Sequence, residues 1–352
     1  MSALAPLLGG EGAPLIIAEL SANHDGSLER ALATIDAIAA TGAQTVKFQT
    51  YRAESMTLDS DGTPFRISDG HGLWAGRRLF DLYREAGTPY EWHAQLFAHA
   101  RDRGLLPFSS PFDGAGVELL ESLDCAVYKI ASAELVDLPL IRTVASTGKP
   151  MVLSTGMATL AEIDAALSAA RGAGSGELVL LSCTAAYPAD PAASHLANIA
   201  VLRESFGVPV GLSDHTPGIG VPVAAVALGA VAVEKHVMLD RDSGGVDSAF
   251  SLVPAELADL VRECAAARAA VGPGPRFGVR PGEEETARLR RSLWVTADVA
   301  PGEVVGPENV RALRPAGGLA PALWEDVVGR PFGRPVAAGT PLDWALLGVA
   351  LD

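Results

Sequence analysis

The chain is 352 residues long, 49% hydrophobic and acidic, with 42 Asp and Glu residues against 27 Lys and Arg residues. Its formal net charge of −15 repels polyanions and argues against a nucleic-acid partner. No apolar run approaches the ~18 residues of a membrane span, the N-terminus lacks a basic leader, and three cysteines without CxxC spacing predict reduced thiols, so we expect a cytoplasmic protein.

Short apolar runs alternate with alanine-rich amphipathic stretches from residue 14 to about residue 271. Near-continuous apolar character is typical of strands buried on both faces. Helical patterns such as 160–173, which opens on a Thr159–Glu162 capping box, fit between the strands. Eight alternations predict a closed α/β architecture, the (β/α)8 TIM barrel, rather than an open dinucleotide-binding sheet. The predicted strands are 14–20, 44–50, 105–110, 126–132, 150–155, 177–184, 208–214 and 230–236.

A long excursion, residues 51–90, interrupts this rhythm between the second and third predicted strands. Loops of that size on a compact barrel are usually functional, most often as a lid or a substrate wall. We therefore expect this segment to carry contacts that select the substrate.

The composition changes near residue 272 to a Pro- and Gly-rich stretch, followed by three consecutive glutamates. We predict a barrel domain over residues 1–275, a linker over 276–287 and a small β-rich domain over 288–352. A module of about 60 residues is marginal alone, so the last domain is expected to need a packing partner.

Two histidines follow neighbouring predicted strands. His215 comes after 208–214 and His236 ends 230–236, so both belong at the same end of the barrel. Two neutral imidazoles placed so can share one divalent metal and leave its other positions open. The alternative is two separate buried histidines, each hydrogen-bonded to backbone.

Other polar residues stand where the predicted strands end, which is where such barrels bind substrate. Lys47 and Lys129 lie inside strands, a costly place for an unpaired cation, and with the nearby hydroxyls they form a plausible phosphate cradle. Glu19 adds a carboxylate suited to acid–base work. Together with the metal, these groups suggest a phosphorylated anion reacting with a carbonyl compound. The remaining strand-end residues are Ser21, Asn23, His24, Gln49, Tyr51, Ser109, Ser110, Asp113, Ser132, Glu134, Ser154, Thr155, Thr184, Tyr187, Ser213 and Lys235.

Nine ordered segments, among them VKFQTY (46–51), GLSDHTPG (211–218) and EKHVMLDR (234–241), resemble the sialic acid synthase family of nonulosonate synthases. Residues 292–319 resemble the family's C-terminal antifreeze-like (SAF) domain, a β-clip type fold. Residues 72–93 look most like the pseudaminic acid synthase branch.

The resemblance implies metal-dependent condensation of phosphoenolpyruvate with an open-chain N-acetylated amino sugar, which releases phosphate and gives a nine-carbon 2-keto sugar acid. His215 and His236 would hold Mn2+, or else Mg2+ or Co2+. The expected product is pseudaminic acid, from 2,4-diacetamido-2,4,6-trideoxy-L-altrose. Positions implied to bind phosphoenolpyruvate are Lys47, Ser110, Lys129, Ser132, Glu134, Ser154 and Ser213, and those near the sugar and the metal-bound water are Glu19, Gln49, Tyr187 and Asp247.

The resemblance also implies a domain-swapped homodimer, in which Arg314 reaches the partner's barrel and holds the N-acyl group of the sugar. Two positions depart from the family. Ala185 replaces an asparagine that touches phosphoenolpyruvate, and Ser110 replaces a threonine while keeping the hydroxyl.

Other functions remain open at this point. The same chemistry would serve an N-acetylneuraminate or legionaminate synthase. From other classes, a Schiff-base aldolase could use Lys129 or Lys47 as its nucleophile, and a non-enzymatic binder could rely on the C-terminal module. Borohydride trapping with pyruvate and an EDTA-sensitive phosphate-release assay would separate these possibilities.

Overall fold

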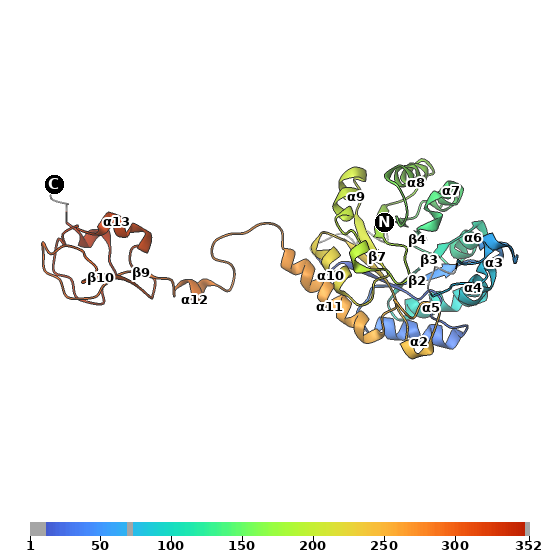
Figure 1. Ribbon diagram of the computed structural model, residues 1–352, viewed down its shortest axis with the longest axis horizontal. Coiled ribbons are helices and arrows are strands. Elements are labelled where there is room, and N and C mark those ends of the chain that lie inside the picture. Colours follow the sequence, from blue (N-terminus) through green and yellow to red (C-terminus); the bar gives the residue numbers. More distant parts are fainter. Residues whose placement is uncertain (1–11, 69–72, 349–352) are drawn as a thin grey trace. The chain divides into compact units, whose positions relative to one another are not determined.

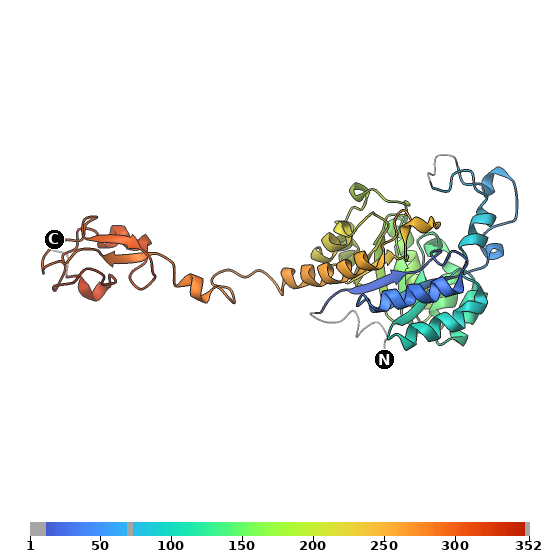
Figure 2. The ribbon, with the colours of Figure 1, turned by 90° about the horizontal axis from the view of Figure 1, so that it is seen from below.

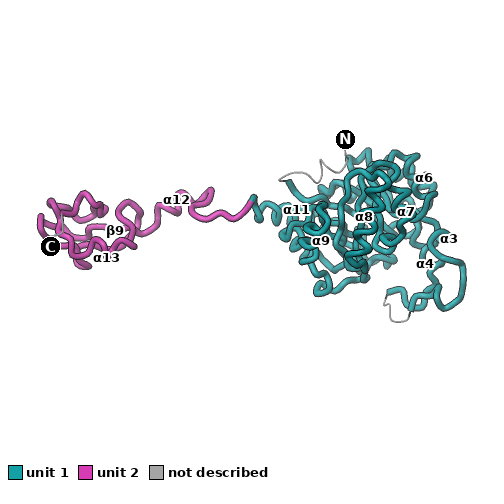
Figure 3. Tube along the Cα trace, turned by 90° about the horizontal axis from the view of Figure 1, so that it is seen from above, with its two compact units in different colours: residues 1–273 teal, residues 274–352 magenta. Residues whose placement is uncertain are grey.

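The computed structural model describes residues 12–68 and 73–348. The chain divides into two compact units, Met1–Pro273 and Gly274–Asp352, which Figure 3 colours separately. The ends of the predicted domains and the start of segment 72–93 lie outside the described residues, at residues 1–11, 69–72 and 349–352.

The first unit is a closed barrel of eight parallel strands paired in chain order, with the last strand beside the first (Figure 1). This confirms the predicted (β/α)8 fold. Along each strand the side chains are almost all buried, as a sheet covered on both faces requires. The strands are β1 (Leu15–Glu19), β2 (Thr45–Thr50), β3 (Leu106–Pro111), β4 (Tyr128–Ile130), β5 (Met151–Ser154), β6 (Leu178–Cys183), β7 (Val210–Asp214) and β8 (Ala232–His236).

Helices form an outer ring and bury their apolar faces against the strands. Thr159 and Glu162 form the predicted capping box, and Ser27 caps its helix by accepting a hydrogen bond from the Arg30 backbone N–H at 3.2 Å. The helices of the ring are α2 (Leu28–Ala39), α5 (His93–Asp102), α6 (Gly114–Ser122), α7 (Leu138–Ala145), α8 (Leu160–Gly172), α9 (Asn198–Phe206), α10 (Gly220–Ala227) and α11 (Pro254–Val271).

Strand register brings the ends of β7, β8, β1 and β2 level with one another. Glu19 on β1 is the partner of His236 on one side and of Lys47 on the other. β7 and β8 approach closely at Gly211, where an added Cβ would lie 2.5 Å from the Ala232 carbonyl oxygen. This register gathers the polar strand ends into one cluster.

The segment between β2 and α5 is folded, and Figure 2 shows it projecting beyond the barrel wall. It contains α3 (Ala53–Met56) and α4 (Leu79–Ala86), with an antiparallel bridge between Arg66 and Arg78. We call residues 51–92 the insertion.

The second unit contains the antiparallel pair β9 (Ser292–Val295) and β10 (Val310–Leu313), with the short helices α12 (Glu284–Ala287) and α13 (Trp324–Val327). Short bridges such as Val299–Val336 add to this pair, and a small core forms around Leu293, Val310 and Phe332. None of the helices in the described residues is both long and apolar enough to span a bilayer.

Candidate active site

His215 and His236 lie side by side at the C-terminal ends of β7 and β8. Their ring centroids are 5.3 Å apart, and Nδ1 of His215 lies 3.0 Å from the Thr184 carbonyl oxygen. That carbonyl can only accept a hydrogen bond, so His215 carries its proton on Nδ1 and keeps a lone pair on Nε2. Burial, aided by the neighbouring His236, lowers the pKa of His215 to about 3, so this ring is neutral at physiological pH.

The second ring, His236, is oriented by a carboxylate. Nδ1 of His236 is buried without a well-formed hydrogen bond, and its nearest charged neighbour is an Asp247 oxygen at 3.3 Å. A carboxylate beside one ring nitrogen directs the other nitrogen toward a ligand. Phe250 packs against this ring, with centroids 4.9 Å apart, and Tyr187 packs against His215 at 4.5 Å.

The donor set fits a divalent metal held by two imidazole nitrogens. Within the described residues, no group of three or more His, Cys, Asp or Glu side chains is arranged to hold an ion. An ion bound here would take oxygen ligands from water and substrate for its remaining positions. The pair therefore suits a catalytic site better than a structural one.

Buried charges adjoin the histidines inside the barrel mouth. Lys47 forms an ion pair with Glu19, and its Nζ lies 3.6 Å from Glu234 and 3.4 Å from the Ser110 hydroxyl. Burial disfavours the charged form of Lys47, but the two carboxylates outweigh burial and raise its pKa. Lys47 is therefore a cation, with a carboxylate on either side.

Lys129 lies on β4 in a different setting. Its Nζ donates hydrogen bonds to Ser154 Oγ at 2.7 Å and to the Ile130 carbonyl oxygen at 2.8 Å. Burial lowers the pKa of Lys129, and within the described residues no carboxylate forms a direct ion pair with it. A bound anion would supply the missing counter-charge.

Two further hydroxyl groups stand at the ends of barrel strands, Ser132 after β4 and Ser213 on β7. Ser132 Oγ accepts a hydrogen bond from the Gly156 backbone N–H at 3.1 Å, and Ser213 Oγ lies 3.4 Å from Glu234. A Cβ on residue 156 would lie 2.7 Å from the Ser132 hydroxyl and 3.1 Å from the Ala185 methyl group, so this close approach needs glycine. Cations combined with short donors suit a phosphate or a carboxylate.

Ala185 lines a cavity of about 650 Å³, together with Thr155, Thr184 and side chains of α8 and α9 such as Ile163 and Leu202. The six cradle residues named above do not line this cavity. The loss of a phosphoenolpyruvate contact at Ala185 stays a prediction.

The other candidate residues lie as follows. Gln49 donates from its amide nitrogen to Ser21 Oγ at 3.0 Å, and Glu134 is half-buried beyond β4, where burial raises its pKa. Arg314 directly follows β10 in the second unit and is exposed. Its proposed reach into a partner's barrel stays a prediction.

Lys235, expected among the strand-end groups, instead pairs with Asp214 at 2.5 Å, and both side chains are buried. Residues 214 and 235 alternate with 213, 215, 234 and 236 along β7 and β8, so their side chains point to the opposite face of the sheet. Glu234 was missed as a site residue, although the same period of two, applied to Glu-Lys-His, places it beside His236. The Asp214–Lys235 pair instead links β7 and β8 on the face of the sheet opposite the histidines.

Each of the two units matches a known protein family or domain. Residues 34–276 match the NeuB family and residues 290–348 match the SAF domain. A pseudaminic acid synthase from Campylobacter jejuni is 42% identical over 327 residues, which cover 93% of this chain and 94% of that protein. An N,N'-diacetyllegionaminic acid synthase from the same species is 34% identical over 90% of this chain and 95% of its own length.

A solved structure agrees in fold. The crystal structure of an N-acetylneuraminic acid (sialic acid) synthetase from Leptospira borgpetersenii, in complex with citrate, superposes with a TM-score of 0.70 at 31% identity. The match covers 79% of this chain and 91% of that one.

Proposed function

The chain belongs to the NeuB family and is a nonulosonate synthase, and from this premise we propose that it makes pseudaminic acid. In the proposed reaction, carbon 3 of phosphoenolpyruvate attacks the aldehyde of open-chain 2,4-diacetamido-2,4,6-trideoxy-L-altrose. Water adds at carbon 2 of the former phosphoenolpyruvate, and phosphate leaves by C–O cleavage. The greater identity to a pseudaminic acid synthase than to a legionaminic acid synthase supports this choice of sugar.

One observation carries the proposal: a buried lysine-and-hydroxyl cradle lies beside two converging imidazoles. Lys47, Lys129 and the hydroxyls of Ser110, Ser132, Ser154 and Ser213 would hold the phosphate and carboxylate of phosphoenolpyruvate. Because no carboxylate of the described part of the chain pairs directly with Lys129, a bound anion would stabilise its charge most.

His215 and His236 would hold the divalent ion, with Mn2+ expected and Mg2+ or Co2+ as alternatives. The ion would supply Lewis acidity toward the sugar aldehyde. Asp247 keeps His236 oriented, while the Tyr187 ring packs against His215. Glu134, whose pKa burial raises, can exchange a proton near the cradle, and Glu19 fixes Lys47.

We also propose a domain-swapped homodimer in the cytoplasm. The second unit has a small core, and such a module gains stability by docking on another surface. A guanidinium at Arg314 could then contact the N-acyl group of a sugar bound to the partner.

Phosphate release tests the function. The purified chain is incubated with phosphoenolpyruvate and either the trideoxy sugar or N-acetylmannosamine, with and without EDTA. We expect metal-dependent release that is faster with the trideoxy sugar, and none in His215→Ala or His236→Ala variants that keep the circular dichroism spectrum. Faster turnover of N-acetylmannosamine would overturn the choice of sugar, and full activity in either variant would remove the metal assignment.

A Schiff-base aldolase has one observation in its favour, the lowered pKa of Lys129. Borohydride reduction in the presence of pyruvate separates the two functions. The synthase should form no covalent adduct, whereas a stable adduct on Lys129 would favour the aldolase.

A further inference from the structure

Trp74, in the insertion, reaches the wall of the site. Its indole N–H donates a hydrogen bond to the Val246 carbonyl oxygen at 3.2 Å, next to Asp247 in the loop that follows β8. Its ring lies 5.6 Å from that of Tyr187, which packs 4.5 Å from His215. The insertion thus touches two different loops of the barrel mouth.

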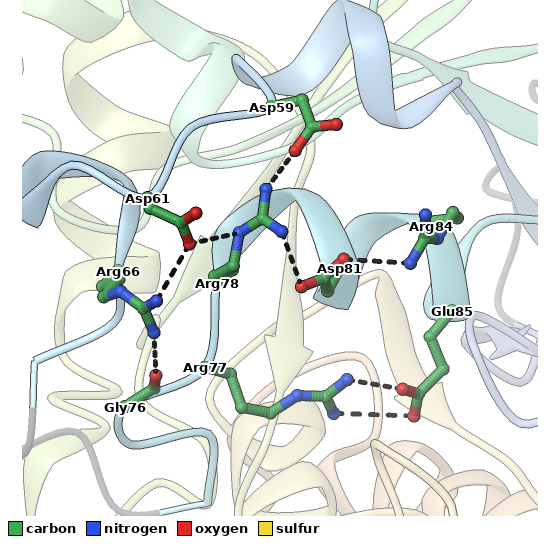
Figure 4. A network of polar contacts seen from close by, with 9 residues as sticks. All are labelled: Asp59, Asp61, Arg66, Gly76, Arg77, Arg78, Asp81, Arg84 and Glu85. Carbon is green, nitrogen blue, oxygen red and sulfur yellow. Dashed lines mark hydrogen bonds and ion pairs between the residues drawn. The ribbon is translucent and has the colours of Figure 1, made fainter.

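An arginine network holds the segment that carries Trp74 (Figure 4). Arg78 pairs with Asp59, Asp61 and Asp81, and Arg66 pairs with Asp61. Arg66 also donates to the Gly76 carbonyl oxygen at 3.3 Å, two residues beyond Trp74. We call these five side chains the arginine clasp.

Backbone hydrogen bonds set the same segment. The Ile67 N–H donates to the Arg77 carbonyl oxygen at 2.9 Å, and the Gly76 N–H donates to the Ile67 carbonyl oxygen at 3.0 Å. The Arg77 N–H donates to the Trp74 carbonyl oxygen at 3.1 Å. Because residues of the clasp contact both sides of this turn, the clasp fixes the position of the indole ring.

Trp74, Tyr187 and Phe250 together make an apolar surface beside the imidazoles, since the Tyr187 and Phe250 rings are 5.3 Å apart. Aromatic faces receive methyl and C–H groups well. A hydroxyl placed there would lose its hydrogen bonds to water without replacement.

We propose that Trp74 is a specificity-determining residue of the sugar subsite, positioned by the arginine clasp. This inference rests on the proposed function and deepens it. With the aldehyde at the histidines, the far end of the open-chain sugar runs along Tyr187 toward Trp74. There the indole favours the methyl terminus of a 6-deoxy sugar over the hydroxymethyl terminus of N-acetylmannosamine.

The test compares two sugars in Trp74→Ala and Trp74→Phe, using the full chain with Mn2+ and saturating phosphoenolpyruvate. We expect Trp74→Ala to lower kcat/KM for the trideoxy sugar about tenfold, the scale of lost hydrophobic selection, mainly through KM. The values for N-acetylmannosamine and the KM for phosphoenolpyruvate should stay within about twofold, since neither depends on this contact. Trp74→Phe keeps an apolar ring and should retain most of the preference.

Matched arginine variants test the positioning role. Arg78→Ala removes the centre of the clasp and should shift the sugar preference in the same direction, by less than Trp74→Ala. Arg84→Ala loses a contact with Asp81 and one with the Phe80 ring, leaves Arg66 and Arg78 in place, and should leave the preference unchanged.

Two outcomes would overturn the inference alone: equal losses with both sugars, or an unchanged preference in Trp74→Ala. Absence of phosphoenolpyruvate-dependent turnover in the unmodified chain would instead reject the proposed function. If Trp74→Ala fails to fold, Trp74→Phe and the intrinsic fluorescence decide. Trideoxy sugar should change the fluorescence of the unmodified chain more than that of Trp74→Phe, and an equal change would overturn the inference.

Discussion

The barrel mouth and the insertion both contain cations that lie between carboxylates. These groups are buried at the mouth and exposed to solvent in the insertion. At the mouth, the side chains of Lys47 and Glu19 are 4% and 0% exposed. In the insertion, Arg78 pairs with Asp59 and Asp61, whose side chains are 62% and 76% exposed. Water screens the charges of the insertion but not those at the barrel mouth.

This difference assigns different work to the two sets. A buried charge depends on each of its partners, because no water can replace one that is lost. The exposed clasp shares its acidic partners and can lose one at little cost. We therefore expect the buried ion pairs at the mouth to contribute strongly to stability and the exposed clasp to contribute little.

The largest effect is expected from Lys47→Met. The substitution leaves Glu19 and Glu234 buried without their cation, which should cost ~3–5 kcal/mol in the free energy of unfolding. Urea denaturation followed by circular dichroism measures the loss. Lys149→Met is the matched control, since its pair with the part-exposed Glu121 should be worth less than ~1 kcal/mol. Equal losses of unfolding free energy in the two variants would contradict the expected difference between buried and exposed ion pairs.

A smaller but still large effect is expected behind the histidines. Asp214→Asn leaves Lys235 buried without a counter-charge, and we expect a loss of ~3 kcal/mol in unfolding free energy. Lys235→Met in the same chain removes the stranded cation, so the double variant should lose less than the sum of the two singles. Strict additivity in urea denaturation would show that the pair is not coupled.

The smallest effect is expected in the clasp. In Asp61→Asn, Arg78 retains Asp59 and Asp81, and Arg66 retains the Gly76 carbonyl oxygen. The urea midpoint should therefore show no resolvable change. A shift of the urea midpoint as large as that of Asp214→Asn would contradict the expected difference between the barrel mouth and the insertion.

The fold could be predicted because each barrel strand is a short apolar run with a polar end. All eight predicted runs coincide with strands, and the predicted helix 160–173 agrees with α8 to within one residue. The Thr159–Glu162 capping box marks where that helix begins.

The site could be predicted only in part. Chain position predicts that Lys47, Lys129 and the two histidines lie at strand ends. It also groups Lys235 with them, because position along a strand does not distinguish side chains that alternate between the two faces of the sheet. No local pattern could find Trp74. Its hydrogen bond joins residues 172 positions apart, and the path of a long insertion depends on tertiary contacts.

The missing side chain at Gly211 has a consequence for redesign. With no Cβ there, β7 packs against the Ala232 carbonyl oxygen of β8 without a clash, and the same two strands carry the imidazoles whose centroids are 5.3 Å apart. A methyl group at this position would meet the Ala232 carbonyl oxygen and Leu181, so Gly211→Ala is expected to move the two strands apart through their backbones. Redesign of the distance between the two rings can therefore start at a residue outside the polar cluster.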